Sequence, residues 1–329
     1  MKAVLCKAYG PPEMLVLEDV PSPVAGPDEV VIKVHACALN FPDLLVIQNK
    51  YQFKMEPPFS PGGELSGTIT QVGPGVTELK AGDKVIVACG IGGFAEEILV
   101  NTKKPNMRII KLPASFTDYA AAASFYVTYS TSYYALKDRG RLKPGETLVV
   151  LGAAGGVGIA AVELGKIMGA RVIACASTPE KLEFCKKYGA DEVINYSTED
   201  LKERIKELTG GKGADVIYDA VGDKFSEPAL RAIAWKGRFL VVGFAAGEIP
   251  RIPLNLALLK GCEIVGVFHG AFASKEPLAN SQNSRELIDM LTTGKVKPFV
   301  QKSYPLADTV QALKDIAARK VMGKIVVVP

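Results

Sequence analysis

The chain has 329 residues, of which 48% are hydrophobic and 22% are charged, and its formal net charge is only +4. This length predicts two domains, and the modest charge without a dense lysine and arginine cluster argues against nucleic acid as a primary partner. An uncharged stretch at residues 148–162 is broken by glycines and is too short to span a bilayer, so no membrane segment is expected.

The start of the chain and its cysteines favour a cytoplasmic protein. Residues 1–10 lead directly into a predicted strand and lack the apolar core of a signal peptide. The six cysteines include no Cys-x-x-Cys pair and are interpreted as reduced, mostly buried thiols. His35 and Cys37 would share one face of a strand, but two ligands do not make a zinc site, so packing is the favoured interpretation of both His35 and His269.

The first third of the chain is predicted to be rich in strands and turns. Short strands are expected at residues 30–38, 67–72, 84–88 and 94–100, separated by turn sequences such as PPFSPGG, GPGV and AGD. From residue 120 to residue 136 the composition changes to that of a helical connector. A compact β domain followed by a second domain is the expected arrangement.

Residues 147–177 predict one complete strand, turn, helix and strand unit. Leu148 to Leu151 form an uninterrupted aliphatic run, which is typical of a parallel strand covered on both faces. A glycine-rich turn follows, and the next apolar residues recur at helical spacing. The N–H groups at such a helix start attract anions, so the turn predicts a dinucleotide site. Its candidate binding residues are Gly152, Ala154, Gly155, Gly156, Val157 and Gly158.

The end of the second strand favours NADPH over NADH. An NAD site usually has Asp or Glu here to bind the ribose 2′-hydroxyl, whereas this chain has Cys175, Ala176 and Ser177. Lys181 could neutralise a 2′-phosphate while Ser177 donates a hydrogen bond to it. The alternative for Lys181 is a solvated position on a helix whose N-cap and first turn are residues 178–180.

Helical and strand patterns then alternate through residue 268. Helices are expected at residues 179–188, 198–208, 228–234 and 254–259, and strands at 192–196, 215–220, 239–244 and 263–268. With the first two strands this gives six, which predicts a doubly wound parallel sheet whose ligands bind at the strand C-terminal ends. The tail is expected to add a strand from about residue 296, a helix at 307–319 and a strand at 324–328.

Several motifs resemble the medium-chain dehydrogenase/reductase superfamily, in particular its zinc-free quinone oxidoreductase branch, which includes zeta-crystallin. They are NFPD (40–43), PGGELSG (61–67), AGD (81–83), GAAGGVG (152–158), YDAVG (218–222) and the closing GKIVV. The resemblance implies a Rossmann domain at residues 123–293, inserted into a GroES-like catalytic domain formed by residues 1–122 and 294–329. It also implies a homodimer.

The chain departs from the zinc-containing alcohol dehydrogenases that the superfamily includes. Where those enzymes have a cysteine and a histidine, this chain has Asn40 and Gly63, and only Glu64 of their Gly-His-Glu motif remains. The four-cysteine lobe that binds their structural zinc is also missing. No metal is therefore expected, and alcohol dehydrogenation is disfavoured because a simple alkoxide would lack a Lewis acid.

The resemblance implies hydride transfer from NADPH to a quinone or an α,β-unsaturated carbonyl acceptor. Such acceptors delocalise the resulting charge and need only hydrogen bonds and a proton. Tyr51 and Thr131 resemble family residues near the nicotinamide, and Asn40 is a candidate for orienting substrate or ribose. Tyr51 is equally compatible with a surface aromatic residue in a loop.

The family likeness also implies the remaining coenzyme contacts. Ser177, Lys181 and Tyr196 resemble residues that bind the 2′-phosphate; the alternative for Tyr196 is a spacer before a helix. The candidates that follow the fifth and sixth strands are Gly243, Phe244, Ala245, Phe268, His269 and Gly270. Their common location at strand ends favours a functional interpretation over a role at the edge of the core.

Three other functions compete with quinone or enone reduction. An enoyl-thioester reductase of the acrylyl-CoA type would need a basic patch for the CoA phosphates, for which Lys50, Lys54, Lys103 and Lys104 are candidates. A non-catalytic NADPH-binding protein would have the same coenzyme site. RNA binding is suggested by the zeta-crystallin likeness, but the modest net charge gives it little support.

Overall fold

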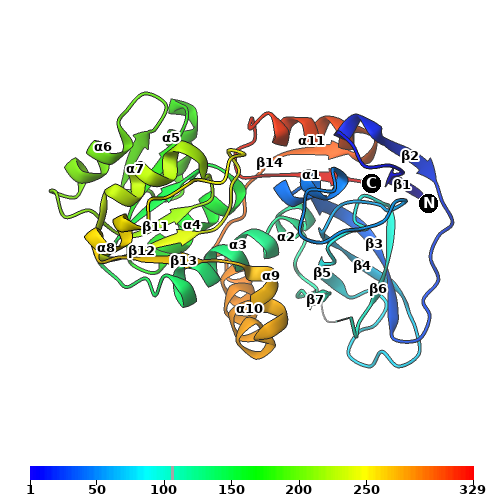
Figure 1. The fold of residues 1–329 in the computed structure, drawn as a ribbon. Helices are drawn as coiled ribbons and strands as arrows, with labels where there is room; N and C mark the ends of the chain where they lie inside the picture. Colours follow the sequence, from blue (N-terminus) through cyan, green and yellow to red (C-terminus); the bar gives the residue numbers. More distant parts are fainter. Residues whose placement is uncertain (105–106) are drawn as a thin grey trace. The chain divides into compact units, whose positions relative to one another are not determined.

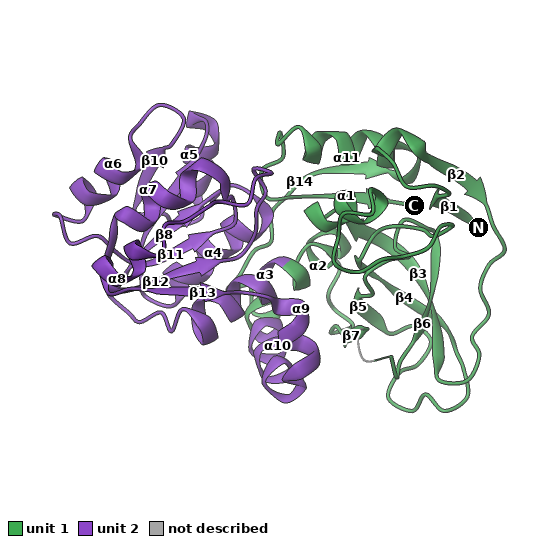
Figure 2. Cartoon of the chain, viewed as in Figure 1, with its two compact units in different colours: residues 1–127, 290–329 green, residues 128–289 purple. Residues whose placement is uncertain are grey.

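The chain folds into two compact structural units. The computed structural model describes residues 1–104 and 107–329, with unit 1 formed by residues 1–127 and 290–329 and unit 2 by residues 128–289 (Figure 2). The chain thus leaves unit 1 at residue 127 and returns to it at residue 290. The boundaries expected from the sequence were at residues 122–123 and 293–294.

Unit 1 is built on a seven-stranded sheet that joins both ends of the chain (Figure 1). Its main path has the order β14-β15-β3-β4-β5-β7, and β6 also pairs with β3. The bounds are β3 (Glu29–Ala38), β4 (Glu64–Val72), β5 (Lys84–Ala88), β6 (Glu97–Asn101), β7 (Arg108–Lys111), β14 (Val300–Pro305) and β15 (Lys324–Val328). A separate hairpin pairs β1 (Lys2–Cys6) with β2 (Leu15–Asp19).

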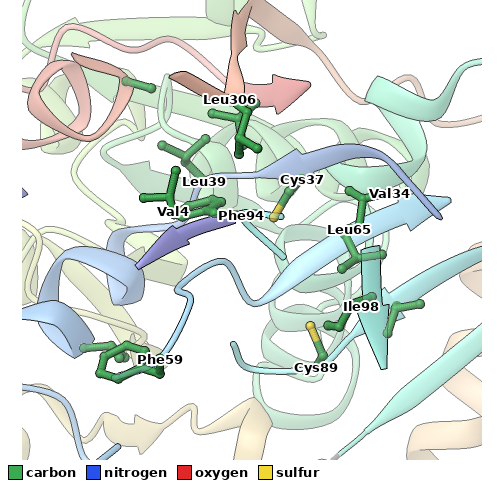
Figure 3. Packing of buried hydrophobic residues seen from close by; sticks show 14 of the residues in the cluster. Val4, Val34, Cys37, Leu39, Phe59, Leu65, Cys89, Phe94, Ile98 and Leu306 are labelled. Carbon is green, nitrogen blue, oxygen red and sulfur yellow. The ribbon is translucent and has the colours of Figure 1, made fainter. Parts of the chain in front are cut away.

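Short helices and one apolar core complete unit 1. The helical segments are η1 (Pro12–Met14), α1 (Phe41–Ile47), α2 (Tyr119–Ala123), η4 (Leu306–Asp308) and α11 (Thr309–Ala317). Figure 3 shows part of the core, in which residues far apart in the sequence, such as Val4, Phe94 and Leu306, belong to one buried cluster. Cys37 and Cys89 belong to the same cluster. Both are free thiols.

Unit 2 contains the predicted six-stranded parallel sheet. The strands are β8 (Thr147–Leu151), β9 (Arg171–Ala176), β10 (Glu192–Asn195), β11 (Ala214–Asp219), β12 (Ile233–Val241) and β13 (Glu263–Gly266). Their order is β10-β9-β8-β11-β12-β13, and every neighbouring pair is parallel. The path reverses between β8 and β11, which is the position where doubly wound sheets bind nucleotides. The fold class predicted from the sequence is therefore confirmed.

Helical segments precede, connect and follow the strands of this sheet. They are α3 (Tyr126–Tyr133), which begins at the end of unit 1, η2 (Tyr134–Arg139), α4 (Gly156–Ile167), α5 (Pro179–Lys187), α6 (Leu201–Leu208), η3 (Asp223–Phe225), α7 (Ser226–Arg231), α8 (Asn255–Lys260), α9 (His269–Lys275) and α10 (Pro277–Thr292). Among the described residues, none of the helices is both long and apolar enough to cross a membrane.

Three expectations about secondary structure were wrong in detail. The connector predicted at residues 120–136 is interrupted, because α2 ends at Ala123 and α3 begins at Tyr126. The helix predicted at residues 228–234 ends at Arg231, and β12 begins at Ile233, because Ala214 of β11 offers Ile233 a pairing partner. Helices α9 and α10 follow β13, where the sequence analysis extended the strand to residue 268 and assigned no element from there to about residue 296.

Candidate coenzyme site and a buried charge cluster

The turn between β8 and α4 has the geometry that its glycines predict. Gly152 has a positive φ of 70°, and a Cβ atom added at Gly158 would lie 2.1 Å from the carbonyl oxygen of Gly152. A Cβ atom added at Gly155 would have one neighbour within 4 Å, the carbonyl oxygen of Gly152 at 3.4 Å, so the space beside Gly155 is open. The glycines therefore let strand and helix approach closely and keep one side of the turn accessible.

This turn fits a pyrophosphate. Helix α4 begins at Gly156, so the backbone N–H groups of its first turn have no carbonyl partner within the helix. The helix dipole adds a positive potential at the same end. Ser132 of α3 donates a hydrogen bond of 2.7 Å to the carbonyl oxygen of Val157, and its oxygen lies 3.0 Å from the hydroxyl of Tyr218. These contacts hold α3, and with it Thr131, beside the turn.

The residues expected to bind a 2′-phosphate follow β9. Ser177 directly precedes the N-cap of α5, and among the described residues its hydroxyl has no hydrogen-bond partner. Lys181 is the third residue of α5, and its backbone N–H donates to Oγ1 of Thr178 at 3.3 Å. The predicted N-cap is therefore confirmed, and it brings the Lys181 backbone close to Ser177.

Tyr196 lines a cavity within unit 2. The cavity has a volume of about 1040 Å³ and is lined by residues that follow the C-terminal ends of β10, β11 and β12. The ring of Tyr196 packs against Phe225, with 4.4 Å between ring centroids. The lining includes basic residues such as Lys224 and Arg251 and acidic residues such as Glu199. Its position at the strand ends is the one expected for part of a nucleotide site.

A buried carboxylate organises the turn that follows β11. Asp219 accepts hydrogen bonds from the backbone N–H groups of Val221 and Gly222, both at 2.9 Å, and from the hydroxyl of Ser226 at 2.5 Å. Burial raises the pKa of Asp219, and these donors partly oppose that shift. The backbone of Gly243 donates to the carbonyl oxygen of Asp219 at 3.2 Å. The turn after β11 thereby fixes the segment after β12.

The predicted segment at residues 243–245 lies against this turn. A Cβ atom at Gly222 would lie 2.8 Å from the ring of Phe244, so glycine is required for the close approach. The N–H of Ala245 donates to the carbonyl oxygen of Ala220 at 3.1 Å. Gly243, Phe244 and Ala245 are thus brought next to the end of β11, as expected for neighbouring parallel strands.

The three predicted residues after β13 have a different setting. Phe268 is 49% exposed and caps α9, which contains both His269 and Gly270. Nε2 of His269 lies 3.2 Å from Oδ1 of Asn280 in α10. The ring of His269 also meets that of Tyr134 at a centroid distance of 6.3 Å. His269 is therefore tied to neighbouring helical segments, which agrees with the packing role favoured from the sequence, and its coenzyme contact stays a prediction.

In unit 1, Asn40 belongs to a buried cluster of charges at the start of α1. Nδ2 of Asn40 donates to Oε2 of Glu64 at 3.1 Å, and Nζ of Lys324 donates to Oδ1 of Asn40 at 2.6 Å. The backbone N–H of Asn40 donates to Oδ2 of Asp43 at 2.7 Å. Lys324 also lies 3.8 Å from Glu64, and its ammonium donates to the carbonyl oxygen of Leu39 at 2.6 Å. Sequence reasoning missed Lys324, although a lysine heading the apolar strand KIVVV was a signal.

Burial dominates the electrostatics of this cluster. It raises the pKa of Asp43 to about 6 and raises the pKa of Glu64, with Lys324 opposing the shift of Glu64. Burial also lowers the pKa of Lys324, which the nearby carboxylates oppose. Tyr51, in the loop after α1, is half-buried against the core of unit 1. Burial, followed by the charge of Asp43, raises the pKa of Tyr51.

The predicted site residues are divided between the units. Asn40 and Tyr51 belong to unit 1, and Thr131 belongs to unit 2 with all the predicted coenzyme contacts. Within residues 1–104 and 107–329, no three His, Cys, Asp or Glu side chains are grouped so that they could hold a metal ion.

A doubly wound sheet with a glycine turn after its first strand, inserted into a β-rich unit, is the architecture of a dinucleotide-dependent oxidoreductase. Family models agree with both parts. The alcohol dehydrogenase GroES-like domain matches residues 26–114, and the zinc-binding dehydrogenase domain matches residues 156–292.

Similar proteins cover nearly the whole chain. A quinone oxidoreductase-like protein 2 homolog of Nematostella vectensis is 40% identical over 99% of this chain and 88% of its own length. The 2-haloacrylate reductase of Burkholderia sp. is 31% identical over 100% and 99%. The crystal structure of Escherichia coli quinone oxidoreductase complexed with NADPH matches with a TM-score of 0.91 and 29% identity, covering 100% of both chains. The chain belongs to the quinone oxidoreductase-like branch of the medium-chain dehydrogenase/reductase superfamily.

Proposed function

We propose that this protein is a zinc-independent reductase that uses NADPH to reduce a quinone or an α,β-unsaturated carbonyl compound. The observation that carries the proposal is the open glycine turn of unit 2, combined with a second strand, β9, that is followed by Ser177 where an NAD site has an acid. Relatives that are named quinone oxidoreductase and 2-haloacrylate reductase support the two acceptor classes.

The chain's own residues have distinct roles in coenzyme binding. The N–H groups at the start of α4 bind the pyrophosphate, and Ser177 and Lys181 bind the 2′-phosphate, with Tyr196 beside them. The segments at residues 243–245 and 268–270 border the nicotinamide end. When bound, NADPH supplies the hydride that reduces the acceptor.

Stabilisation of the reduced acceptor falls to hydrogen-bond donors. Reduction of a quinone or an enone leaves a phenolate or an enolate oxygen, which hydrogen-bond donors stabilise before it is protonated. The candidates are the amide of Asn40 and the hydroxyls of Tyr51 and Thr131. Among the described residues, the hydroxyls of Tyr51 and Thr131 have no hydrogen-bond partner, so both can serve a ligand.

Coenzyme oxidation with a panel of acceptors tests the proposal. Purified protein is expected to oxidise NADPH in the presence of small quinones or alkenones and to prefer NADPH strongly over NADH. Turnover should fall in Tyr51→Phe and Thr131→Ala, while NADPH affinity, measured by fluorescence, stays within a few-fold. A protein that binds NADPH but is inert with every acceptor would instead be the non-catalytic binder.

A second substrate class is favoured by one comparison. 2-Haloacrylate carries a carbon–carbon double bond conjugated to a carboxylate, and its reductase matches the full length of this chain. Conjugated acids and their thioesters therefore belong in the acceptor panel. Saturation with acrylyl-CoA or crotonyl-CoA at lower concentration than with quinones would identify an enoyl-thioester reductase.

We also propose that the protein forms a homodimer through the free edge of the unit 2 sheet. Strand β13 is the last strand of that sheet, and Ile264 on it is exposed. Exposed apolar side chains surround this edge, including Leu258 of α8 and Trp235, whose ring packs over Gly261. An uncovered apolar edge strand is usually paired in a stable protein. Light scattering should find a dimer that Ile264→Lys with Leu258→Lys dissociates; a wild-type monomer at micromolar concentration contradicts the proposal.

A cytoplasmic location is proposed from the thiols. All six cysteines are free, and only Cys262 among them is not buried. Unpaired cysteines are typical of a reducing compartment. Cell fractionation with the full chain tests this proposal, and recovery from an oxidising compartment would contradict it.

A further inference from the structure

The side-chain amide of Asn40 lies between a buried ammonium group and a buried carboxylate. Its Oδ1 atom is 2.6 Å from Nζ of Lys324, and its Nδ2 atom is 3.1 Å from Oε2 of Glu64. The side chains of Lys324 and Glu64 are only 6% and 0% exposed, whereas Asn40 is partly exposed. All three residues belong to unit 1.

Lys324 and Glu64 determine the orientation of the Asn40 amide. An ammonium group can only donate hydrogen bonds, and an ionised carboxylate can only accept them. Oδ1 must therefore face Lys324, and Nδ2 must face Glu64. Both neighbours are themselves held, because Lys324 also donates to the carbonyl oxygen of Leu39 and Oε1 of Glu64 accepts from the N–H of Val127 at 2.8 Å.

One donor of this amide remains available. Nδ2 carries two hydrogens, of which one is bonded to Glu64, and no other described residue accepts the second. The partial exposure of Asn40 leaves that second N–H accessible to a ligand. A free amide could rotate to offer its oxygen instead, but the charged neighbours prevent this rotation.

We propose that Lys324 and Glu64 are positioning residues that fix the Asn40 amide so that it offers an N–H, and not its oxygen, to an oxygen atom of a bound ligand. The inference rests on the proposed function, since that oxygen is either a hydroxyl of the coenzyme or the carbonyl oxygen of the acceptor. A preorganised N–H group stabilises the negatively charged oxygen of the transition state more strongly than it stabilises the neutral carbonyl oxygen of the unreacted acceptor.

The two charges must be removed together in a test. Lys324→Met alone leaves two buried carboxylates, Glu64 and Asp43, without their ammonium partner, and is expected to destabilise unit 1 severely. The double variant Lys324→Met with Glu64→Gln removes opposite charges as a pair. It leaves one buried carboxyl group, Asp43, which keeps its hydrogen bond from the backbone N–H of Asn40 and whose pKa is already raised to about 6, so the variant is expected to fold. It also removes what fixes the amide, because methionine offers no donor to Oδ1 and glutamine can either donate or accept, so both orientations of the Asn40 amide become possible.

The first measurement is steady-state kinetics. It compares this double variant, Asn40→Leu, and the triple variant that combines all three substitutions. The double variant and Asn40→Leu should each lower kcat or weaken NADPH binding by on the order of 100-fold, and the triple variant should lose little more. A loss in kcat identifies the acceptor oxygen, and a loss in NADPH affinity identifies the coenzyme. Lys111→Met is the matched control, because it removes a lysine 2.8 Å from the buried carboxylate of Asp83 elsewhere in unit 1, and its kcat should equal that of wild type.

Side-chain amide exchange provides a measurement that does not need turnover. In wild type, one Nδ2 proton of Asn40 should exchange slowly by ¹⁵N NMR because it is bonded to buried Glu64, and in the double variant both should exchange fast. Unchanged exchange, a folded double variant with wild-type kinetics, or multiplicative losses in the triple variant would each overturn the inference. A wild-type protein that reduces no acceptor would defeat only the proposed function, since NADPH affinity and amide exchange would still report on Asn40.

Discussion

A pair of glycine substitutions in the turn after β8 separates its structural role from its ligand-binding role. In Gly158→Ala, the new Cβ atom would lie 2.1 Å from the carbonyl oxygen of Gly152 and 2.8 Å from Cα of Ala153. In Gly155→Ala, the nearest atom is the oxygen of Gly152 at 3.4 Å, which is an ordinary contact. The two variants add the same methyl group to the same turn, so each is the control for the other.

The clash at Gly158 can be converted into a stability change. Cβ atoms essentially never lie within 3.0 Å of such neighbours, so α4 and β8 must separate by about 1 Å. Leu148 and Val162, which lie on these two elements, are fully buried, so the separation disturbs a packed core. Overpacking of this kind costs about 1–3 kcal/mol, which lowers the Tm of a domain of this size by roughly 2–12 °C.

Gly155→Ala is expected to change stability little. Gly155 has φ −77° and ψ 172°, which alanine adopts without strain, and the changes in helix capping and in unfolded-state entropy are each below about 1 kcal/mol and oppose each other. Its methyl group would project into the open side of the turn, where the pyrophosphate is proposed to bind. The loss of a charge-assisted backbone contact there predicts NADPH affinity roughly 10- to 150-fold weaker.

Calorimetry and NADPH titration on both variants check these expectations. The expected pattern is a lower Tm for Gly158→Ala alone, together with a large loss of NADPH affinity in the stable Gly155→Ala. If Gly155→Ala binds NADPH as wild type does, the pyrophosphate does not lie against this turn. If Gly158→Ala melts at the wild-type temperature, strand and helix are not packed as closely as the distances indicate.

Three further predictions address the charges of unit 2. Arg238→Met should cost about 3 kcal/mol in urea unfolding, because it leaves Glu146 without a bidentate partner at 2.6 and 3.0 Å. The second prediction concerns Glu286. Burial alone would raise the pKa of Glu286, but hydrogen bonds from Lys137 and others outweigh burial and lower that pKa to about 2. Because the pKa of Glu286 in the folded protein is below its ordinary value, the ionised carboxylate stabilises the fold fully above about pH 4.5, and this contribution is lost towards pH 2. Glu286→Gln should therefore flatten the plot of unfolding free energy against pH between these values. Lys181→Ala should weaken NADPH binding roughly 10-fold or more and leave NADH unchanged; equal effects on both coenzymes would exclude a 2′-phosphate contact.

Local patterns were sufficient to predict the sheet of unit 2. Leu148 to Leu151 show no alternation because both faces of β8 are covered, and all four residues are fully buried. The glycines after β8 and the apolar spacing of α4 are equally local signals. The same reasoning brought the segments after β9, β11 and β12 to one end of the sheet, because parallel strands end there together.

Helix α10 escaped prediction because the first half of its buried face is polar, and only the second half, with Leu287 and Leu291, is apolar. Asn280 and Asn283 are almost fully buried on it, and asparagine normally indicates a turn or a cap. The partners that make this burial tolerable come from distant segments. Asn283 accepts a hydrogen bond from Lys137 at 3.0 Å and donates one to Asp138 at 2.7 Å. No periodicity within the helix carries that information.

Lys324 was missed for the same reason, and its position depends on strand register. Val326 and Val327 of β15 pair with Ala38 and Cys37 of antiparallel β3, and continuing that ladder brings Lys324 opposite Asn40, 284 positions away in the sequence. A slip of β15 by one residue would turn its side chains to the opposite faces of the sheet and remove the ammonium from Glu64. Two buried carboxylates would then lack a counter-charge, which is far more costly than exposing one valine. The ion cluster at Asn40 therefore fixes the register of the last strand, and that register in turn holds the cluster together.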